Sequence, residues 1–316
     1  RTDLSPRFPP LIVLFFGVLG ISSGSILVRL AQGQDMPSLV IAAWRLTLAS
    51  SFLLPLVLMK RRSELRKMTA SAWGLAIISG FMLALHFASW ISSLAYTSVA
   101  SSTVLVTTTP LWVGLTAPFL LKEKLSQPLK IGITLAMLGS VLIGVADVVA
   151  VVDGHFQFSL TQFSNQANPL LGNGLALVGA IAASAYLIIG RRLRFGMSLL
   201  SYIALVYSAA AFFLIIMAIA SGYDLFGYSS TAYLVMILMA IFPQLIGHSS
   251  YNWALGYLSA ASVSVAVVAE PIGATLLALL IFQEIPNWIT MTGSTLLLAG
   301  IVYASRPERN TAVTLT

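Results

Sequence analysis

The chain has 316 residues, of which 58% are hydrophobic and only 9% are charged, and its formal net charge is +7. An ordinary water-soluble domain carries about 25% charged residues, so this composition excludes that class and predicts a protein that crosses a membrane several times. The sequence contains no cysteine, which excludes disulfides, zinc–thiolate sites and thiol catalysis.

Ten apolar runs are long enough to cross a membrane as helices. We expect these spans at residues 11–31, 39–59, 72–94, 98–121, 128–147, 170–190, 198–221, 230–253, 258–282 and 287–305. The first run lacks a convincing cleavage site, which favours a spanning helix over a signal peptide. The long polar connector at 148–169 is expected to be an external loop or a short surface helix.

Basic residues indicate the orientation of these spans. Ten spans place fifteen of the 17 Lys and Arg on one side of the membrane. These are Arg1, Arg7, Lys60, Arg61, Arg62, Arg66, Lys67, Lys122, Lys124, Lys130, Arg191, Arg192, Arg194, Arg306 and Arg309. Since such an excess in short loops marks the cytoplasmic face, we predict a multi-pass protein of the cytoplasmic (inner) membrane with both termini cytoplasmic. The net charge then reflects topology, and no nucleic-acid partner is expected.

The sequence repeats itself after 161 residues. This shift aligns, without a gap, Tyr96, Ser98, Pro110, Glu123, Gly132 and Gly139 with Tyr257, Ser259, Pro271, Glu284, Gly293 and Gly300. Because the period covers five spans, an odd number, the second copy must enter the membrane from the opposite side. Inverted repeats are typical of secondary transporters, whose substrate sites lie near the midplane between the repeats.

Several segments together resemble the EamA family of the drug/metabolite transporter superfamily. They are the prolines of the fourth and ninth spans, "LKEK" and "FQEI" after those spans, "MPSLVIAAWRLTLAS" with Arg45, and "NPLLGNGLALVGAIAASAYLIIGRRLR". The resemblance implies transport of small metabolites by alternating access, often export of amino acids or related compounds. It also implies a supporting layer of spans four, five, nine and ten, with a possible homodimer contact.

The predicted fold is therefore an all-α integral membrane protein with ten transmembrane helices arranged as two inverted five-helix repeats. The first repeat is expected at residues 1–148, the external connecting loop at 149–169, and the second, inverted repeat at 170–316. The two repeats are expected to rock about a central cavity lined by spans one to three and six to eight.

Proline and glutamate interrupt the ninth span, and each has its own explanation. Pro110 and Pro271 occupy equivalent positions, so a kink is predicted in both repeats, serving either packing or gating. Glu270 corresponds to Thr109, so the repeat does not require a carboxylate there. An intramembrane charge usually faces a cavity or a partner. Three roles remain open for Glu270: a structural ion pair with Arg45, proton coupling, or binding of a substrate amino group.

Polar and aromatic residues recur every four positions in the third and eighth spans. The third span has His86 and Trp90 on one face, and the eighth has Gln244, His248 and Asn252, flanked by Tyr251. In lipid, such a stripe must face protein or water. We therefore expect these six residues and Glu270 to line a substrate cavity, although interhelical hydrogen bonding explains a histidine equally well, and the aromatic rings offer cation–π contacts.

The predicted function is a secondary transporter that moves a small organic metabolite, plausibly an amino acid or a derivative, by alternating access and in the export direction. The alternatives are an uptake or uncoupled exchange carrier, an intramembrane enzyme, and a non-transporting membrane receptor. The sequence contains no Walker loop, HExxH pair or paired carboxylates, so we expect no enzyme activity, no cofactor and no metal site. The expected partners are a small-molecule substrate and membrane lipids.

Overall fold

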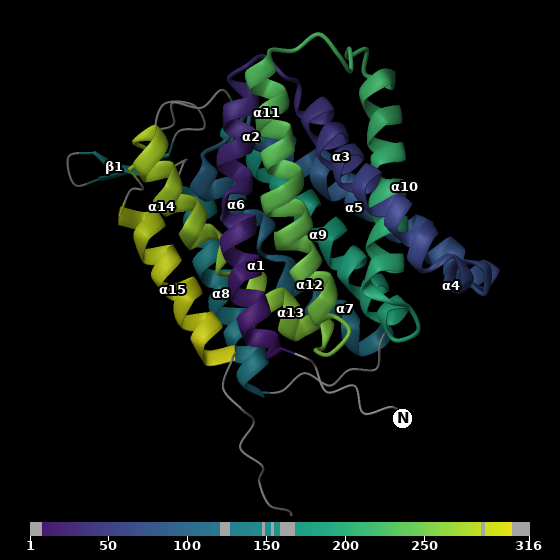
Figure 1. Cartoon of the computed structure of the whole chain (residues 1–316). Helices are drawn as coiled ribbons and strands as arrows, with labels where there is room; N and C mark the ends of the chain where they lie inside the picture. Colours follow the sequence, from purple (N-terminus) through teal and green to yellow (C-terminus); the bar gives the residue numbers. More distant parts are fainter. Residues whose placement is uncertain are drawn as a thin grey trace, which may run out of the picture.

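The computed structural model describes residues 8–120, 127–146, 149–152, 155–158, 168–285 and 288–304. In this part of the chain, long apolar helices form one bundle, with a two-stranded hairpin at its edge (Figure 1). Of the residues used for the sequence predictions, Arg1, Arg7, Lys122, Glu123, Lys124, Arg306 and Arg309 lie outside the described part.

The helices of the first half follow the predicted order. They are α1 (Pro10–Ser22), α2 (Gly24–Gln32), α3 (Ser38–Lys60), α4 (Arg62–Arg66), α5 (Ala70–Ser93), α6 (Val99–Val106), α7 (Thr109–Leu120) and α8 (Gln127–Ala146). The second half contains α9 (Pro169–Arg194), α10 (Leu199–Ala220), α11 (Ser230–Met239), the π-helix η1 (Ala240–His248), α12 (Ser249–Ala254), α13 (Ala260–Val267), α14 (Glu270–Phe282) and α15 (Trp288–Ala304).

Eight helical segments within the described residues are long and apolar enough to cross a membrane. They correspond to eight of the predicted spans. The predicted fifth and tenth spans correspond to α8 and α15, whose described apolar stretches, Lys130–Leu142 and Met291–Gly300, are shorter. The protein is thus a multi-pass membrane protein.

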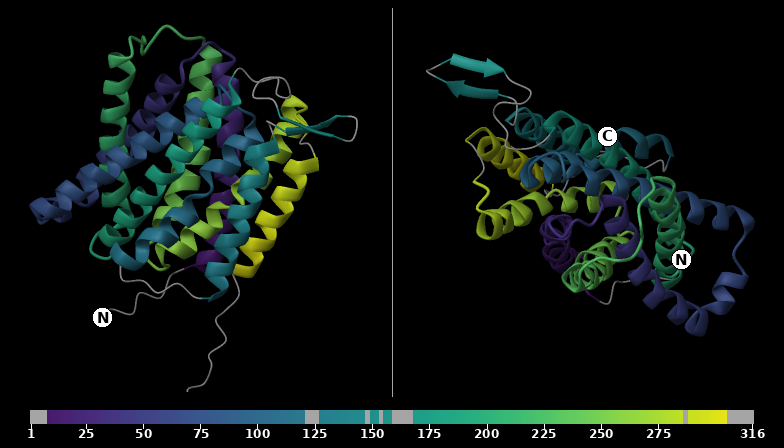
Figure 2. Two further views of the ribbon diagram at one scale, coloured as in Figure 1. Left: turned by 180° about the vertical axis from the view of Figure 1, so that it is seen from behind. Right: turned by 90° about the horizontal axis from the view of Figure 1, so that it is seen from above.

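The long connector departs from the prediction of a loop or a surface helix. Strands β1 (Val149–Val152) and β2 (His155–Phe158) pair antiparallel, with Val149 opposite Phe158 and Val152 opposite His155. β-Branched valines and alternating aromatic residues favour extended backbone over helix. Apart from this hairpin, which projects from the bundle (Figure 2), the described fold is all-α as predicted.

The duplication of the sequence is visible in the helix boundaries. Helix α13 begins and ends 161 residues after α6, and α14 and α15 begin 161 residues after α7 and α8. Equivalent serines cap α6 and α13, because the Ser98 and Ser259 hydroxyls accept hydrogen bonds from backbone N–H groups three residues later. Both predicted kinks are interruptions between two helices, and Pro110 and Pro271 are the second residues of α7 and α14.

The first helices of the two halves are exchanged in the packing. Helix α9 packs along α5, α6 and α7, whereas α1 packs against η1, α12 and α14. At one end of the bundle, the Arg29 guanidinium near the end of α2 donates a hydrogen bond to the Thr97 carbonyl (2.7 Å), and the Thr97 hydroxyl bonds Asn173 near the start of α9 (2.9 Å). The first helix of the second half therefore begins where that of the first half ends.

Glycines allow α8 and α15 to cross at close range along one side of the molecule (Figure 2). A Cβ added at Gly139 would lie 2.5 Å from the Gly293 carbonyl oxygen, and one at Gly300 would lie 2.7 Å from the Gly132 carbonyl oxygen. Small residues permit such approach between helices in membranes. The four glycines aligned by the repeat thus form two equivalent contacts.

The eighth span contains one residue more than the third. Its helix runs 25 residues, Ser230–Ala254, whereas α5 has 24. The additional residue coincides with η1, the π-helix, which contains Pro243 and so lacks one backbone N–H donor. Glycines of α1 fit against this segment, because a Cβ at Gly20 would lie 2.9 Å from the Phe242 carbonyl oxygen.

Candidate functional site

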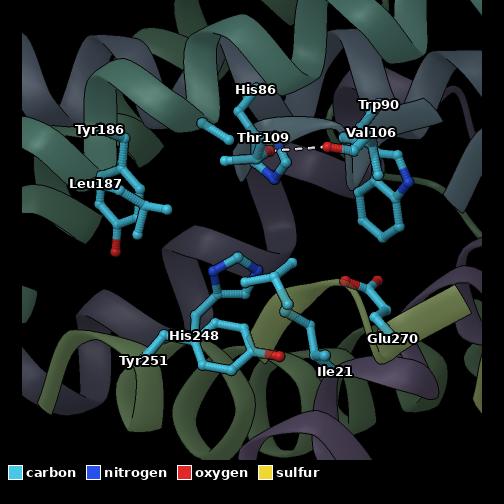
Figure 3. Close-up of a pocket in the computed structure, with 12 residues that line it drawn as sticks. Ile21, His86, Trp90, Val106, Thr109, Tyr186, Leu187, His248, Tyr251 and Glu270 are labelled. Carbon is cyan, nitrogen blue, oxygen red and sulfur yellow. Dashed lines mark hydrogen bonds between the residues drawn. The ribbon is translucent and has the colours of Figure 1, made fainter. Parts of the chain in front are cut away.

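A cavity lies between the two halves of the bundle (Figure 3). Its lining comes from α1, α5, α6, α7, η1 and α12, and from α9, α13 and α14: Ile21, His86, Trp90, Val106, Thr109, Ala183, Tyr186, Leu187, His248, Tyr251, Val267 and Glu270. The cavity volume is about 40 Å³. A single water needs roughly 10–15 Å³ on such a measure, so the cavity holds a few waters and must widen to admit an organic solute.

Several lining positions are related by the repeat. Trp90 corresponds to Tyr251. Likewise, Val106 corresponds to Val267, and Thr109 to Glu270. The cavity therefore lies at the interface of the repeats, where secondary transporters place their substrate sites.

The structure brings together five of the seven residues expected to line a cavity. They are His86, Trp90, His248, Tyr251 and Glu270, each at most 9% exposed. The other two, Gln244 and Asn252, are buried outside the lining. Gln244 bonds Arg45 of α3, and Asn252 bonds Tyr186 and Tyr207. The polar stripe of the eighth span thus meets different neighbouring helices along its length.

The Glu270 carboxylate reaches the cavity from the first residue of α14. It is 4% exposed, and no hydrogen bond or ion pair within the described residues engages its side-chain oxygens. Its backbone carbonyl accepts a hydrogen bond from the Ser22 hydroxyl of α1 (3.3 Å). Burial of a carboxylate without a bonded partner costs free energy. Because no described residue bonds the Glu270 side-chain oxygens, they are available to a ligand.

Arg45 is fully buried and forms no ion pair within 4.0 Å with Glu270. Its Nε donates to Gln244 Oε1 (2.7 Å), and its guanidinium lies 4.2 Å from the Phe87 ring centroid. Within the described residues, the one ion pair with nitrogen and oxygen within 4.0 Å joins Arg29 and Glu284. The structural ion pair between Arg45 and Glu270 that the sequence suggested is thus not formed in this structure. Arg45 instead fixes η1 through Gln244.

Four aromatic rings face one another across the cavity. The His86 and Trp90 rings are stacked with centroids 6.1 Å apart, and the His248 ring lies 6.1 Å from His86 and 6.2 Å from Tyr251. The His86 Nδ1 donates to the Gly179 carbonyl of α9 (3.0 Å). A neutral imidazole bonded in this way has Nε2 as its acceptor.

Hydrogen-bonding atoms in the lining are left unsatisfied by the protein. Trp90 Nε1 and the Tyr251 hydroxyl are buried and have no partner within the described residues. Figure 3 shows Glu270, Trp90 and Tyr251 around the same space. The site therefore presents a carboxylate acceptor, two donors and several aromatic faces. These groups suit a small solute with a cationic group and an acceptor group.

A network around Arg29 links the helices at one end of the bundle. Arg29 Nη1 pairs with Glu284 (3.3 Å) and Nη2 donates to the Thr97 carbonyl. The other Glu284 oxygen accepts from the Val99 N–H (3.4 Å). Because this network links the first span to the connectors beside the fourth and ninth spans, it holds that end together. No pattern in the sequence indicates this partner for Arg29.

Arginines of α9 link the helices at the opposite end of the bundle. Arg191 donates to the Leu255 carbonyl (2.6 Å), and Arg194 Nε donates to the Asn252 carbonyl (3.0 Å). Deeper in, the Tyr186 hydroxyl donates to Asn252 Oδ1 (2.5 Å), whose Nδ2 donates to the Tyr207 hydroxyl (3.1 Å). These contacts join the sixth and seventh spans to the eighth and to the connector after it.

The lining differs in composition from the expected one. Spans four and nine, predicted as a supporting layer, contribute Val106, Thr109, Val267 and Glu270, whereas spans two and seven contribute no residue to this lining. Tyr186 and Leu187 of the sixth span also belong to it. The broken helices explain the change, because each break brings the start of α7 or α14 to the cavity.

A sequence model of the EamA-like transporter family matches residues 9–145 and, a second time, residues 170–306. The chain belongs to the EamA-like transporter family. The two matches confirm the resemblance drawn from the sequence, and they give this EamA-like protein two copies of the family's unit and a general role in membrane transport.

Two further similarities accompany the family match. A protein of Clostridium kluyveri named "Uncharacterized transporter" is 26% identical over 227 residues, which are 69% of this chain and 68% of that protein. This EamA-like chain is also similar to a crystal structure, with 18% sequence identity and a TM-score of 0.68. The match covers 94% of this chain and 96% of the chain in that structure. That structure shows the same fold.

Proposed function

We propose that the protein is a secondary transporter that carries a small amphipathic organic solute with a cationic group, such as an amino acid or a derivative, by alternating access. The observation that carries this proposal is the Glu270 carboxylate, which is 4% exposed in the cavity between the repeats. The charge of a solute ammonium would compensate the carboxylate, and the aromatic rings would cover its apolar part.

The acceptor group of the solute would bind the two unsatisfied donors. Trp90 Nε1 and the Tyr251 hydroxyl occupy repeat-equivalent residues, one from each half. A carboxylate held by both would touch the two halves at once. Widening the cavity on one side then requires breaking either the Arg29 network or the Arg191 and Arg194 contacts. A ligand shifts this equilibrium only through its different affinities for the two forms.

The proposed architecture is ten spans in two inverted repeats, with α8 and α15 as the fifth and tenth. Both termini are proposed to be cytoplasmic. This orientation is supported by Lys67 and Arg192, two of the residues used to orient the spans, which line one surface cleft and so lie at the same end of the bundle. The proposed direction is the export that the family resemblance implies, and the proposed homodimer follows from the same resemblance.

The test is counterflow in liposomes that contain the purified full chain. Phenylalanine and phenethylamine form one pair of probes, and leucine and isoamylamine form another, because each pair differs in the carboxylate. We expect exchange of amines and amino acids that Glu270→Gln abolishes. If only the amino acids were exchanged, we would assign the Trp90 and Tyr251 donors to binding of the solute carboxylate. Chemical conversion of a probe without net movement would contradict transport.

A further inference from the structure

A second and larger cavity opens at the end of the bundle where α4, α5 and α9 meet. It has a volume of about 490 Å³. We call it the basic cleft, and its lining is Glu64, Lys67, Met68, Thr69, Ser71, Ala72, Leu75, Arg192, Leu193, Gly196 and Met197. This volume lies within the roughly 300–1,000 Å³ of ligand pockets. Figure 1 shows α4 at the edge of the molecule, and the basic cleft shares no lining residue with the central cavity.

Two cations at the rim of the basic cleft have no acidic partner among the residues that the structure describes. Lys67 and Arg192 are exposed, and neither takes part in an ion pair within the described residues. The acidic residue in the lining, Glu64, is already engaged: its two oxygens accept hydrogen bonds from the Ser198 N–H (2.6 Å) and hydroxyl (2.7 Å). The surrounding segments 60–67 and 191–194 carry eight Lys and Arg against one Glu. An anion is therefore the favoured occupant.

The floor of the basic cleft is apolar. Met68 and Leu75 are partly buried, and Leu193 and Met197 are each 7% exposed. Trp73, at the start of the adjacent α5, is 38% exposed, and tryptophans in such positions anchor helices at the membrane interface. A cationic rim over an apolar floor at this depth matches a phosphate headgroup joined to acyl chains.

The cations are not a consequence of the duplicated fold. In the repeat register, Lys67 corresponds to Tyr228, and Arg192 corresponds to Ala31. The equivalent place at the other end thus lacks both charges. The basic cleft is specific to one face of the molecule, and this is expected of a site for lipids of one leaflet.

We propose that the basic cleft binds the phosphodiester headgroup of an anionic phospholipid from the leaflet at this end, with Lys67 and Arg192 as ligands of the phosphate. The bound lipid bridges the connector between the second and third spans and the end of the sixth. It is a site apart from the transport cavity, so its binding is measured without any transported solute.

The test measures lipid binding to the purified full chain by native mass spectrometry and by thermal stability. The probes are dioleoyl phosphatidylglycerol and dioleoyl phosphatidylcholine. We expect phosphatidylglycerol to bind about tenfold more tightly or better, since each juxtamembrane Lys or Arg attracts anionic lipid. The double variant Lys67→Gln/Arg192→Gln should reduce this preference about tenfold.

The matched control is Arg62→Gln/Arg66→Gln, which removes two charges from exposed positions of α4 that do not line the basic cleft. It should leave the preference within about twofold of the unmodified chain. An equal loss in both double variants would overturn the site and leave a diffuse charge effect. If inorganic phosphate or glycerol 3-phosphate, added to the protein in phosphatidylcholine, raised its thermal stability as much as phosphatidylglycerol does, a lipid would not be the occupant.

Discussion

The starts of α7 and α14 show how two copies of one segment diverge. Each follows a break, and each has proline as its second residue. In the first copy the Thr109 hydroxyl donates to the Val106 carbonyl of its own chain segment (2.8 Å). In the second copy the residue is Glu270, whose carboxylate faces the cavity without a bonded partner in the described residues. The two copies have the same break and the same helix start, but only the second places a carboxylate at the cavity.

This difference separates the residues that form the scaffold of the cavity from the residues that give the cavity its polar groups. The breaks, the capping serines and the glycine contacts recur in both repeats, so they serve the scaffold. Glu270, His86 and His248 lack a matching residue at the equivalent position. A site on a symmetric scaffold therefore gains its selectivity from the positions where symmetry is lost.

Among the variants that test this comparison, removal of the Glu270 charge is expected to have the largest effect. Glu270→Gln should lower flux of a cationic solute at least about thirtyfold, because losing one partner of a desolvated charge pair costs about 2 kcal/mol or more. The same variant should unfold at an unchanged or higher temperature, since a buried unpaired charge is removed. Liposome flux and thermal unfolding measure the two effects.

The control is Thr109→Val, which changes the equivalent position of the first repeat. It should keep flux within about threefold, because the Thr109 hydroxyl bonds only backbone carbonyls. If Glu270→Gln instead destabilised the protein and left flux unchanged, the carboxylate would be a structural group.

The glycine contacts test whether equivalent scaffold positions have equal weight. Gly139→Ala and Gly300→Ala should each lower the free energy of unfolding by about 1–3 kcal/mol, since the new methyl group overlaps a backbone carbonyl. Gly174→Ala is the control, because a Cβ there meets nothing within 4 Å. A large effect at one site alone would show that the contacts are not equivalent.

The Arg29–Glu284 pair joins the two copies at one end of the bundle. A double-mutant cycle with Arg29→Gln and Glu284→Gln should give a coupling free energy of about 0.5–1 kcal/mol, because the side chains are 19% and 27% exposed. The coupling should shrink in high salt. A coupling of zero at low salt would leave the Thr97 hydrogen bond as the whole contact.

Capping at α10 gives the smallest expected effect. Burial raises the pKa of Glu64, but hydrogen bonds from Ser198 and Ser201 and the charge of Arg61 together lower it below its ordinary value. A lowered pKa stabilises the fold above the ordinary pKa, and this stabilisation is lost as pH falls through the folded value. The equivalent helix α3 has Pro37 as its N-cap and no such side chain.

Glu64→Gln should therefore lower stability at pH 7 by less than about 1 kcal/mol. The difference from the unmodified chain should shrink as pH falls below the ordinary Glu pKa of about 4.3. Melting curves between pH 7 and pH 3.5 measure it. A difference that grew on acidification would reverse the assigned sign.

The duplicated elements were predictable because their determinants are local and occur twice. One shift of the sequence located Pro110 and Pro271 and the four glycines that the structure places at breaks and crossings. The polar residues of the third and eighth spans likewise identified His86 and His248, and the charge within the ninth span identified Glu270. The structure gathers all three at one cavity. Apolar lining residues such as Val106 and Leu187 gave no signal, because every span is rich in them.

Features that depend on the path of one helix past another were not predictable. Arg45 bonds Gln244, since the second span passes η1 there, and this choice of partner over Glu270 is set by packing. The role of spans four and nine in the lining follows from their breaks meeting the first and sixth spans. The hairpin of β1 and β2 was not predictable, because its strands are short and their sequence also fits a loop.

The additional residue of the eighth span bears on the energetics of the whole molecule. Two identical inverted halves would give inward-open and outward-open forms of equal free energy, because exchanging the halves converts one form into the other. The nine-residue π-helix η1 has no counterpart in the third span, which is α-helical throughout. Under the proposed alternating access, the two forms would then not be degenerate, so the empty protein is expected to populate them unequally and to respond differently to a solute offered from each side.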